Sequence, residues 1–295
     1  MMNRKVVIVT GATNGIGEVA AREIATQGAT TVLISRNQSK LENTVEAIKS
    51  ATGNPNVSYI QADLSDMQQV KQAAESFLSQ YDRLDVLLNN AGGWFAERKL
   101  SADGYEMTLA LNHLNYFLLT HSLLDMLKHT AAEYGEARIV NVSSGAHFQA
   151  DGNFADIQRE NSYGMGGNTY SESKLMNVLF TYALARRLQG THVAVNVLHP
   201  GFVNTGFGGT SNWLMSGLTS IAKTLFARSP EKGAETPVYL ATSPEVKGIS
   251  GKYWENKRQK QSSKVSYEEA KQEELWRISE ELVERALQPA SISME

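Results

Sequence analysis

Short apolar runs rich in β-branched residues alternate along this chain with longer stretches whose apolar residues recur at helical spacing. The runs predict seven strands, at Lys5–Val9, Thr31–Ile34, Val57–Ala62, Leu84–Leu88, Arg138–Val142, Val193–Leu198 and Gly251–Trp254. The longer stretches predict helices, at Gly15–Gln27, Lys40–Ser50, Asp66–Gln80, about Tyr105–Lys128 and Tyr170–Leu188. Such alternation indicates an α/β fold with a doubly wound parallel sheet of about seven strands and helices on both faces. No composition shift divides the chain, so we expect one domain over residues 1–295.

Three segments depart from this rhythm. Gly145–Thr169 is a long insertion rich in Gly and Asn, and residues 206–229 hold an apolar stretch after the sixth predicted strand. Long irregular connections in a compact domain are often lids or binding loops, so we assign residues 206–229 as a substrate-loop region. Residues 267–287 place apolar side chains on a polar background and predict an amphipathic C-terminal helix packed on the core.

Composition narrows the class of protein. The 295 residues carry a net charge of −3, which argues against a nucleic-acid partner, and they include no cysteine for a disulfide, a thiolate nucleophile or a thiolate metal site. No carboxylate–histidine cluster has metal-ligand spacing, so we expect no catalytic metal. The chain runs directly into its first strand and has no uninterrupted apolar run of ~18 residues. We therefore expect a cytoplasmic protein without a membrane anchor.

A glycine-rich turn at Thr10–Gly17 leaves a predicted strand and enters a predicted helix. Gly11 permits the tight turn, Gly15 lets the backbone approach a pyrophosphate, and Gly17 allows close helix packing. The helix N-terminus offers free N–H groups and a partial positive charge to phosphates. The turn predicts a Rossmann-type dinucleotide site that includes Gly11, Thr13, Asn14, Gly15, Ile16 and Gly17.

Tyr170 and Lys174 stand four residues apart on a predicted helix and so share one face. A tyrosine is a poor acid at neutral pH, its free pKa being about 10. A neighbouring cation favours the phenolate, and we expect Lys174 to lower the pKa of Tyr170. Beside a dinucleotide turn, this pair is typical of proton transfer to or from a carbonyl oxygen.

Further short motifs occur in a fixed order. They are Asp63-Leu64, Asn89-Asn90-Ala91-Gly92, Ser143-Ser144, the Tyr170/Lys174 pair and Pro200-Gly201 followed by Thr205. With the glycine turn, this set resembles the short-chain dehydrogenase/reductase superfamily. The resemblance implies cofactor contacts at Asp63, Leu64, Asn90, Ala91, Gly92, Tyr170, Lys174, Pro200, Gly201, Val203 and Thr205.

A narrower resemblance is visible at Leu111–Leu114, at Phe117–Thr120 and in the run around Tyr170, which are similar to retinol dehydrogenases and related reductases. Asn115 departs from that branch, which usually carries glycine there. The resemblance implies a catalytic set of Asn112, Ser144, Tyr170 and Lys174. Tyr170 would be the general acid or base, and Lys174 would hold the nicotinamide ribose. Ser144 would bind the substrate oxygen, and Asn112 would kink its helix and hold a water leading from Lys174 to solvent.

Two assignments inside this set stay open. Ser143 competes with Ser144 for the substrate oxygen, because the spacing to Tyr170 does not separate the two serines. His147 and Phe148 follow the serine pair and are candidates either for the substrate mouth or for the surface.

The second predicted strand ends without the acidic residue that binds a ribose 2′-hydroxyl in NAD-dependent folds. Arg36 stands there instead, and its planar fork suits a 2′-phosphate. We therefore predict NADP(H) as the cofactor.

These residues predict an NADPH-dependent oxidoreductase acting on an apolar aldehyde, ketone or alcohol. The apolar pocket is expected from loop aromatics at the carboxyl ends of strands: Trp94, Phe95, Phe148, Phe202 and Trp213. Two alternatives remain, a non-catalytic NADP(H)-sensing scaffold and an NADPH reductase of a conjugated C=C bond. The resemblance also implies a homodimer or homotetramer through the two long helices, or a monomer if the C-terminal helix covers that face.

Overall fold

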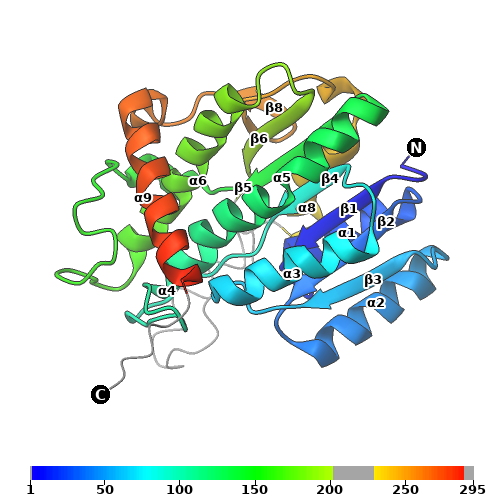
Figure 1. Cartoon of the computed structure of the whole chain (residues 1–295), viewed down its shortest axis with the longest axis horizontal. Coiled ribbons are helices and arrows are strands. Elements are labelled where there is room, and N and C mark those ends of the chain that lie inside the picture. Colours follow the sequence, from blue (N-terminus) through cyan, green and yellow to red (C-terminus); the bar gives the residue numbers. More distant parts are fainter. Residues whose placement is uncertain (1, 202–228, 289–295) are drawn as a thin grey trace.

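A computed structural model of the chain describes residues 2–201 and 229–288. One sheet with the strand order β3-β2-β1-β4-β5-β6-β7-β8 forms its centre (Figure 1). The strands are β1 (Val6–Thr10), β2 (Thr30–Ser35), β3 (Val57–Gln61), β4 (Val86–Asn89), β5 (Ala137–Val142), β6 (Val193–His199), β7 (Tyr253–Glu255) and β8 (Arg258–Lys260). All neighbouring strands from β3 to β7 pair in parallel. The predicted α/β fold and doubly wound sheet are confirmed.

The strand order reverses direction between β1 and β4. Chain connections leave these two strands toward opposite sides, which opens a crevice at their carboxyl ends. The glycine turn follows β1, and Asn89-Asn90-Ala91-Gly92 spans the end of β4. The fold therefore brings both motifs to the same crevice.

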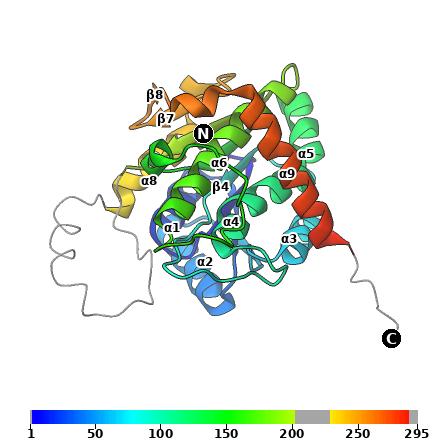
Figure 2. The same ribbon diagram turned by 90° about the vertical axis from the view of Figure 1, so that its left-hand side faces the viewer.

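The sheet is buried on both faces because its strands alternate their side chains between two cores. Val6 and Ile8 of β1 face one core, which is covered by α3, α5, α6 and α9. Val7 and Val9 face the other core, which is covered by α1, α2 and α8. Figure 2 shows these two helix layers on opposite sides of the molecule.

The helices follow the predicted pattern with shifted ends. They are α1 (Gly15–Thr26), α2 (Gln38–Thr52), α3 (Met67–Gln80), α4 (Met107–Leu109), α5 (Asn115–Tyr134), α6 (Gly167–Arg187), α8 (Pro230–Thr242) and α9 (Glu269–Leu287). The helix expected over Tyr105–Lys128 is instead divided into α4, a π-helical turn η1 (Ala110–Leu114) and α5. The helix α8 was not predicted from the sequence. Its start nevertheless carries two ordinary signals, Ser229 at the N-cap and Pro230 in the first turn.

The sequence prediction also did not include β8, which forms a short antiparallel hairpin with β7. Its two turn residues, Asn256 and Lys257, have φ of 52° and 59°. Two-residue hairpin loops of type I′ need this left-handed backbone at both positions. Asn tolerates it and Lys does so less readily, so the pair is a weak signal in sequence.

The C-terminal helix α9 packs against α5 and α6. The Trp276 ring lies 5.2 Å from the Phe117 ring and 5.9 Å from the Phe180 ring, centre to centre. The Arg187 guanidinium lies over the Trp276 ring at 3.8 Å and also pairs with Glu273. The face expected to pair two copies of the chain is therefore occupied by a helix of the same chain.

Val203, Thr205, Phe202, Trp213 and most of the expected substrate-loop region lie outside the described residues. Ser229, at the end of that region, caps α8. Among the helices within residues 2–201 and 229–288, none has the length and apolar content needed to cross a membrane.

Candidate active site

The turn after β1 is shaped by glycines that other residues could not replace without movement. Gly11 has φ +65° and Gly15 has φ +55°. A Cβ on Gly11 would lie 2.8 Å from the Ala91 Cα, and one on Gly17 would overlap the Gly11 carbonyl oxygen. No side chain within the described residues caps the N-terminus of α1, where Asn14 is exposed. The turn therefore leaves backbone N–H groups at the helix start for an anion.

Residues after β4 hold this turn in place. The Thr10 hydroxyl accepts hydrogen bonds from the backbone N–H groups of Asn90 and Ala91, at 2.9 and 3.0 Å. The Asn90 side chain donates to the Thr10 carbonyl at 2.9 Å. Asn90 and Ala91 thus position the glycine turn from the neighbouring strand.

The end of β2 places hydroxyl groups and a cation at one corner of the crevice. The Thr13 and Ser35 hydroxyls lie 3.2 Å apart, and Arg36 follows as an exposed side chain. Arg36 makes no ion pair with any residue that the structure describes. The Asp63 carboxylate accepts from the Ser65 N–H at 2.9 Å, while Leu64 is buried.

Lys174 is buried at 2% exposure on α6, with its ammonium beneath the end of β5. Its Nζ donates to the Val142 carbonyl at 3.3 Å. No salt bridge joins it to a carboxylate of residues 2–201 or 229–288. Because burial penalises the charged form, the pKa of Lys174 falls to about 7. The lysine can therefore hold or lose a proton near neutral pH.

Tyr170 is partly buried one turn before Lys174. Desolvation raises its pKa, and a hydrogen bond with Ser144 opposes that rise. The expected lowering by Lys174 is wrong for this conformation. The lysine Nζ lies 5.7 Å from the Tyr170 ring centre and donates to Val142 instead.

The two serines after β5 have different partners. Ser143 is buried, and its hydroxyl donates to the Lys174 carbonyl at 2.7 Å. Ser144 is partly exposed, its hydroxyl accepts from the Ala146 N–H at 3.2 Å, and it bonds to the Tyr170 phenol. Ser144 is therefore the serine that shares the reaction side of the site with Tyr170.

Asn112 lies in the π-helical turn and links the segment after β4 to α6. Its side chain accepts from the Gly93 N–H at 2.7 Å, and its amide donates to the Gly93 carbonyl and the Ser173 hydroxyl, each at 2.9 Å. A Cβ on Gly92 would lie 3.1 Å from the Asn112 Oδ1 and 3.3 Å from the Lys174 Nζ. The Asn112 amide is thus engaged in holding the site together, next to Lys174.

Asn115 compensates for the π turn. In that turn the Asn115 N–H bonds to the Ala110 carbonyl, five residues back, which displaces the ordinary partner of the Leu111 carbonyl. The Asn115 side-chain amide donates to the Leu111 carbonyl. Where the resembling branch usually carries glycine, this chain has a side chain that satisfies the displaced carbonyl.

The histidines near the serines are structural. His147 is fully buried, with Nδ1 donating to the Ser144 carbonyl at 2.7 Å and Nε2 accepting from the Ser263 N–H at 3.1 Å. Both placements expected for His147, the substrate mouth and the surface, are therefore wrong, whereas Phe148 is 55% exposed. His199 accepts from the Gly145 N–H at 3.0 Å, next to Ser144. Both imidazoles therefore position the serine loop, which spacing alone did not indicate.

Apolar side chains gather where the insertion reaches the site. Gly166, with φ +75°, packs so closely that a Cβ would overlap the Phe95 carbonyl and approach the Trp94 ring nitrogen. Met165 beside it is 68% exposed. The Tyr163 hydroxyl donates to the Phe95 carbonyl at 2.9 Å, which joins the two loops. Trp94 and Phe95 thus border the N-terminus of α6.

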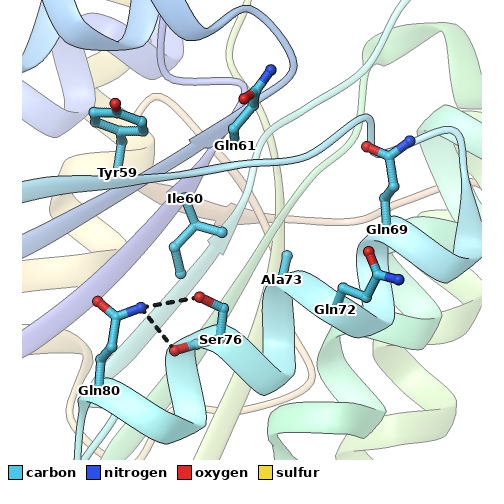
Figure 3. Close-up of a pocket in the computed structure, with 8 residues that line it drawn as sticks. All are labelled: Tyr59, Ile60, Gln61, Gln69, Gln72, Ala73, Ser76 and Gln80. Carbon is cyan, nitrogen blue, oxygen red and sulfur yellow. Dashed lines mark hydrogen bonds between the residues drawn. The ribbon is translucent and has the colours of Figure 1, made fainter.

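A separate hollow of ≈ 360 Å³ lies at the β3 edge of the sheet, between β3 and α3 (Figure 3). Its polar lining consists mainly of amides, and Gln80 there bonds to Ser76. It holds none of the predicted site residues. Among the described residues, no group of three or more histidine, aspartate or glutamate side chains is placed to hold a metal ion.

Comparisons with known proteins agree with this geometry. A family model described as short chain dehydrogenase matches residues 5–213. The chain is 37% identical to Homo sapiens retinol dehydrogenase 14 over 298 residues, which is 96% of this chain and 87% of that protein. It is also 37% identical to Homo sapiens polyprenol dehydrogenase over 280 residues, covering 94% of this chain and 84% of that protein. Among solved structures, an uncharacterized protein from Mycobacterium paratuberculosis is 27% identical, with a TM-score of 0.77 over 96% of this chain and 94% of that one.

Proposed function

The chain belongs to the short-chain dehydrogenase family, and on this basis we propose that it is an NADPH-dependent oxidoreductase of apolar aldehydes, ketones or alcohols. The observation that carries the proposal is the cluster of Ser144, Tyr170 and Lys174 beside the glycine turn. The cluster combines a phenol, a hydroxyl bonded to it and a lysine whose pKa lies near 7.

Tyr170 supplies the proton in the direction of reduction. As negative charge develops on the substrate oxygen, the Ser144 hydroxyl donates a hydrogen bond to it and the Tyr170 phenol transfers its proton. In oxidation the same groups act in reverse, and Tyr170 accepts the alcohol proton. The nicotinamide would supply or take up the hydride.

Lys174 restores the proton that Tyr170 gives up. In the conformation described above the ammonium donates to Val142 and does not lower the pKa of Tyr170. It would stabilise the phenolate by charge attraction once the lysine side chain turns toward it. Because burial brings the lysine pKa to about 7, the proton passes from Lys174 to Tyr170 at little cost near neutral pH. The Asn112 amide bonds to both Gly93 and Ser173, and so holds α6 against the segment after β4 beside this pair.

The crevice fits a dinucleotide. The uncapped start of α1 and its free backbone N–H groups suit a pyrophosphate. The glycines keep the turn in this shape, because a Cβ on Gly11 or Gly17 would collide with Ala91, Asn90 or the Gly11 carbonyl. Gly92, Pro200 and Gly201 would border the nicotinamide, and Gly201 has φ +89°. The Asp63-Leu64 pair, which follows β3, would contact the adenine.

The preference for NADPH rests on Arg36. Its exposed guanidinium follows β2 together with the Thr13 and Ser35 hydroxyls, and no carboxylate of the described residues pairs with it. A 2′-phosphate would receive a charge-assisted, two-pronged contact there. Replacement by aspartate would repel that phosphate and favour a 2′-hydroxyl.

The apolar substrate class rests on Trp94, Phe95 and the exposed Met165 beside α6. The related proteins bear the names retinol dehydrogenase and polyprenol dehydrogenase, and both names denote long apolar alcohols. A pocket of this kind gains affinity mainly from apolar surface removed from water.

The test is cofactor oxidation against a panel of aldehydes and ketones, with NADPH and NADH in parallel. We expect turnover with NADPH favoured, and reversal of that preference in Arg36→Asp. Tyr170→Phe should keep NADPH binding and lose kcat by about 10³-fold, within the range of general acid–base catalysis. The matched control is Tyr81→Phe, whose hydroxyl bonds to Ser58 at the far edge of the sheet.

Each part of the proposal has its own contrary result. Tight NADPH binding without turnover on the whole panel would indicate a sensing scaffold. Turnover only with conjugated double bonds would move the chemistry to C=C reduction. Retained turnover in Tyr170→Phe would remove that residue from the mechanism, and an unchanged preference in Arg36→Asp would remove Arg36 from cofactor selection.

A further inference from the structure

Tyr116 is a fully buried tyrosine whose hydroxyl has no hydrogen-bond partner within residues 2–201 and 229–288. Buried polar groups are almost always paired, because an unpaired one loses its hydrogen bonds to water without replacement. Phenylalanine at this position would fill the same space without that cost. The hydroxyl therefore calls for an explanation beyond packing.

The phenol lies at the proposed proton path. The Lys174 Nζ is 6.0 Å from the centre of the Tyr116 ring and 5.7 Å from the centre of the Tyr170 ring. Charge on Tyr170 would also raise the pKa of Tyr116, so the two phenols are electrostatically coupled. Tyr116 follows the π turn that holds Asn112, and it reaches the lysine from α5 while Tyr170 reaches it from α6.

A hydroxyl suits a lysine that changes its charge. A phenol accepts a hydrogen bond from an ammonium and donates one to a neutral amine, whereas a carboxylate only accepts. Lys174 alternates between these two forms because its pKa is about 7. Burial raises the pKa of Tyr116 well above its usual value, so this phenol stays neutral and does not compete with Tyr170 as an acid.

We propose that Tyr116 is a positioning residue for the proton transfer, whose hydroxyl partners the Lys174 side chain in both of its protonation states. This rests on the proposed function of Tyr170 and Lys174. No hydrogen bond joins the two groups in this conformation, so the contact would need a turn of the lysine side chain or one bridging water. Tyr116 thereby holds the ammonium in place after burial has removed its water, and sets the pH at which the lysine gives up its proton.

Few charged groups compete for this role. Among the described residues, the titratable side chains found next to Lys174 are Tyr170 on its own helix and Tyr116 on α5. Desolvation accounts for the lowered pKa of Lys174, with no carboxylate or second cation of the described residues contributing. A change at Tyr116 should therefore register directly in the titration of the Lys174–Tyr170 pair.

The test is Tyr116→Phe, which removes one oxygen and keeps the ring. Without the hydroxyl the buried ammonium loses an acceptor, so the lysine should deprotonate at lower pH. We expect kcat for reduction to fall about tenfold, in the range of one lost charge-assisted hydrogen bond. The alkaline limb of the kcat–pH profile should move to lower pH, with NADPH affinity unchanged. Tyr105→Phe is the control, because Tyr105 is also buried but its hydroxyl bonds to the Leu282 carbonyl at 2.6 Å.

A second readout does not need turnover. Ultraviolet titration of tyrosinate, taken as the difference between proteins with and without Tyr170, should show the Tyr170 pKa raised in the Tyr116→Phe background. A Tyr116→Phe protein that is more stable, with an unchanged pH profile and an unchanged Tyr170 titration, would overturn the proposal and leave Tyr116 as a packing residue. If the wild-type protein reduces no carbonyl, the proposed function fails, yet this titration still decides the role of Tyr116.

Discussion

Buried charged side chains are paired with opposite charges at the amino ends of the parallel strands, but not at their carboxyl ends. At the amino end, before β4, the Asp85 carboxylate is 2% exposed and accepts from the Val6 N–H at 2.9 Å and from the Arg83 Nε at 2.8 Å. Arg83 also lies over the Tyr134 ring at 3.5 Å. Beside it, Arg138 pairs with Glu136 at 2.7 Å and donates to the Ser243 carbonyl at 2.8 Å. Each of these buried charges has an opposite charge and several hydrogen bonds.

At the carboxyl end, buried polar groups are left partly unpaired. Lys174 has a carbonyl but no carboxylate among the described residues, and the Tyr116 hydroxyl and the Asn115 Oδ1 have no hydrogen-bond partner there. Asn115 and Tyr116 begin α5 directly after the π turn, whereas Lys174 lies on the neighbouring α6. Such arrangements cost stability and concentrate at functional sites.

The difference follows from what each end must do. A buried ion pair that is fully satisfied holds strands and helices in one register but has no free proton to exchange. A lysine without a counter-charge has a pKa near 7 and can exchange one. The satisfied ion pairs at the amino end therefore offset the loss of folding stability caused by the unpaired Lys174 at the carboxyl end.

Lys174→Met should give the largest effect, and it tests whether the unpaired buried charge at the carboxyl end lowers stability. The pKa of Lys174 is lower in the folded than in the unfolded chain, so its penalty is fully present below pH 7 and fades as pH rises toward 10.5. The variant should be inactive, yet more stable than the wild type at pH 6 by about 5 kcal/mol, because the pKa falls from 10.5 to about 7 and each unit is worth about 1.36 kcal/mol. Denaturant unfolding at several pH values measures this difference.

The control for that variant is Lys71→Met, since Lys71 lies on the surface of α3 in an ion pair with Glu75. It should change stability little at any pH. Equal stability of Lys174→Met and the wild type across the pH range would show that the buried lysine carries no penalty, and the contrast between the two ends would be lost.

Asp85→Ala should give the next largest effect, and it tests whether the paired charges at the amino end stabilise the fold without affecting activity. It leaves the Arg83 charge and the Val6 N–H without their acceptor, which typically costs about 3 kcal/mol for a disrupted buried pair. We expect that loss in denaturant unfolding, with kcat unchanged at a temperature where the protein stays folded. Asp125→Ala is the matched control, because its carboxylate is fully exposed beside Lys128. A fall in kcat for Asp85→Ala would contradict the division of labour.

Asn115→Ala should give the smallest effect and sharpen the comparison inside the site. It removes the amide that satisfies the Leu111 carbonyl at the π turn, and an unpaired buried carbonyl costs about 1 kcal/mol or slightly more. Ser79→Ala removes a similar side chain-to-carbonyl bond at an exposed helix end and should cost little. If both variants unfold like the wild type, Asn115 does not repair the turn.

Much of the architecture was predictable because it depends on local spacing. The continuous apolar run in Val6–Thr10, and similar runs in the strands that follow, indicate a sheet buried on both faces. Gly11 and Gly15 mark positive φ in the turn, and the four-residue spacing of Tyr170 and Lys174 places them on one helix face. The start of α8 carries an ordinary capping signal at Ser229, whereas the turn before β8, at Asn256 and Lys257, carries only a weak one.

The chemistry of the site was decided by the tertiary structure. Which serine faces Tyr170, where His147 bonds and how Asn112 is held all depend on segments distant in the chain. The same is true of the pKa directions, because sequence spacing predicted that Lys174 would lower the pKa of Tyr170, and burial raises it. Periodicity along a chain determines which residues share a helix or strand. Desolvation and hydrogen bonding depend on every atom that packs around a group, and only the folded molecule brings those atoms together.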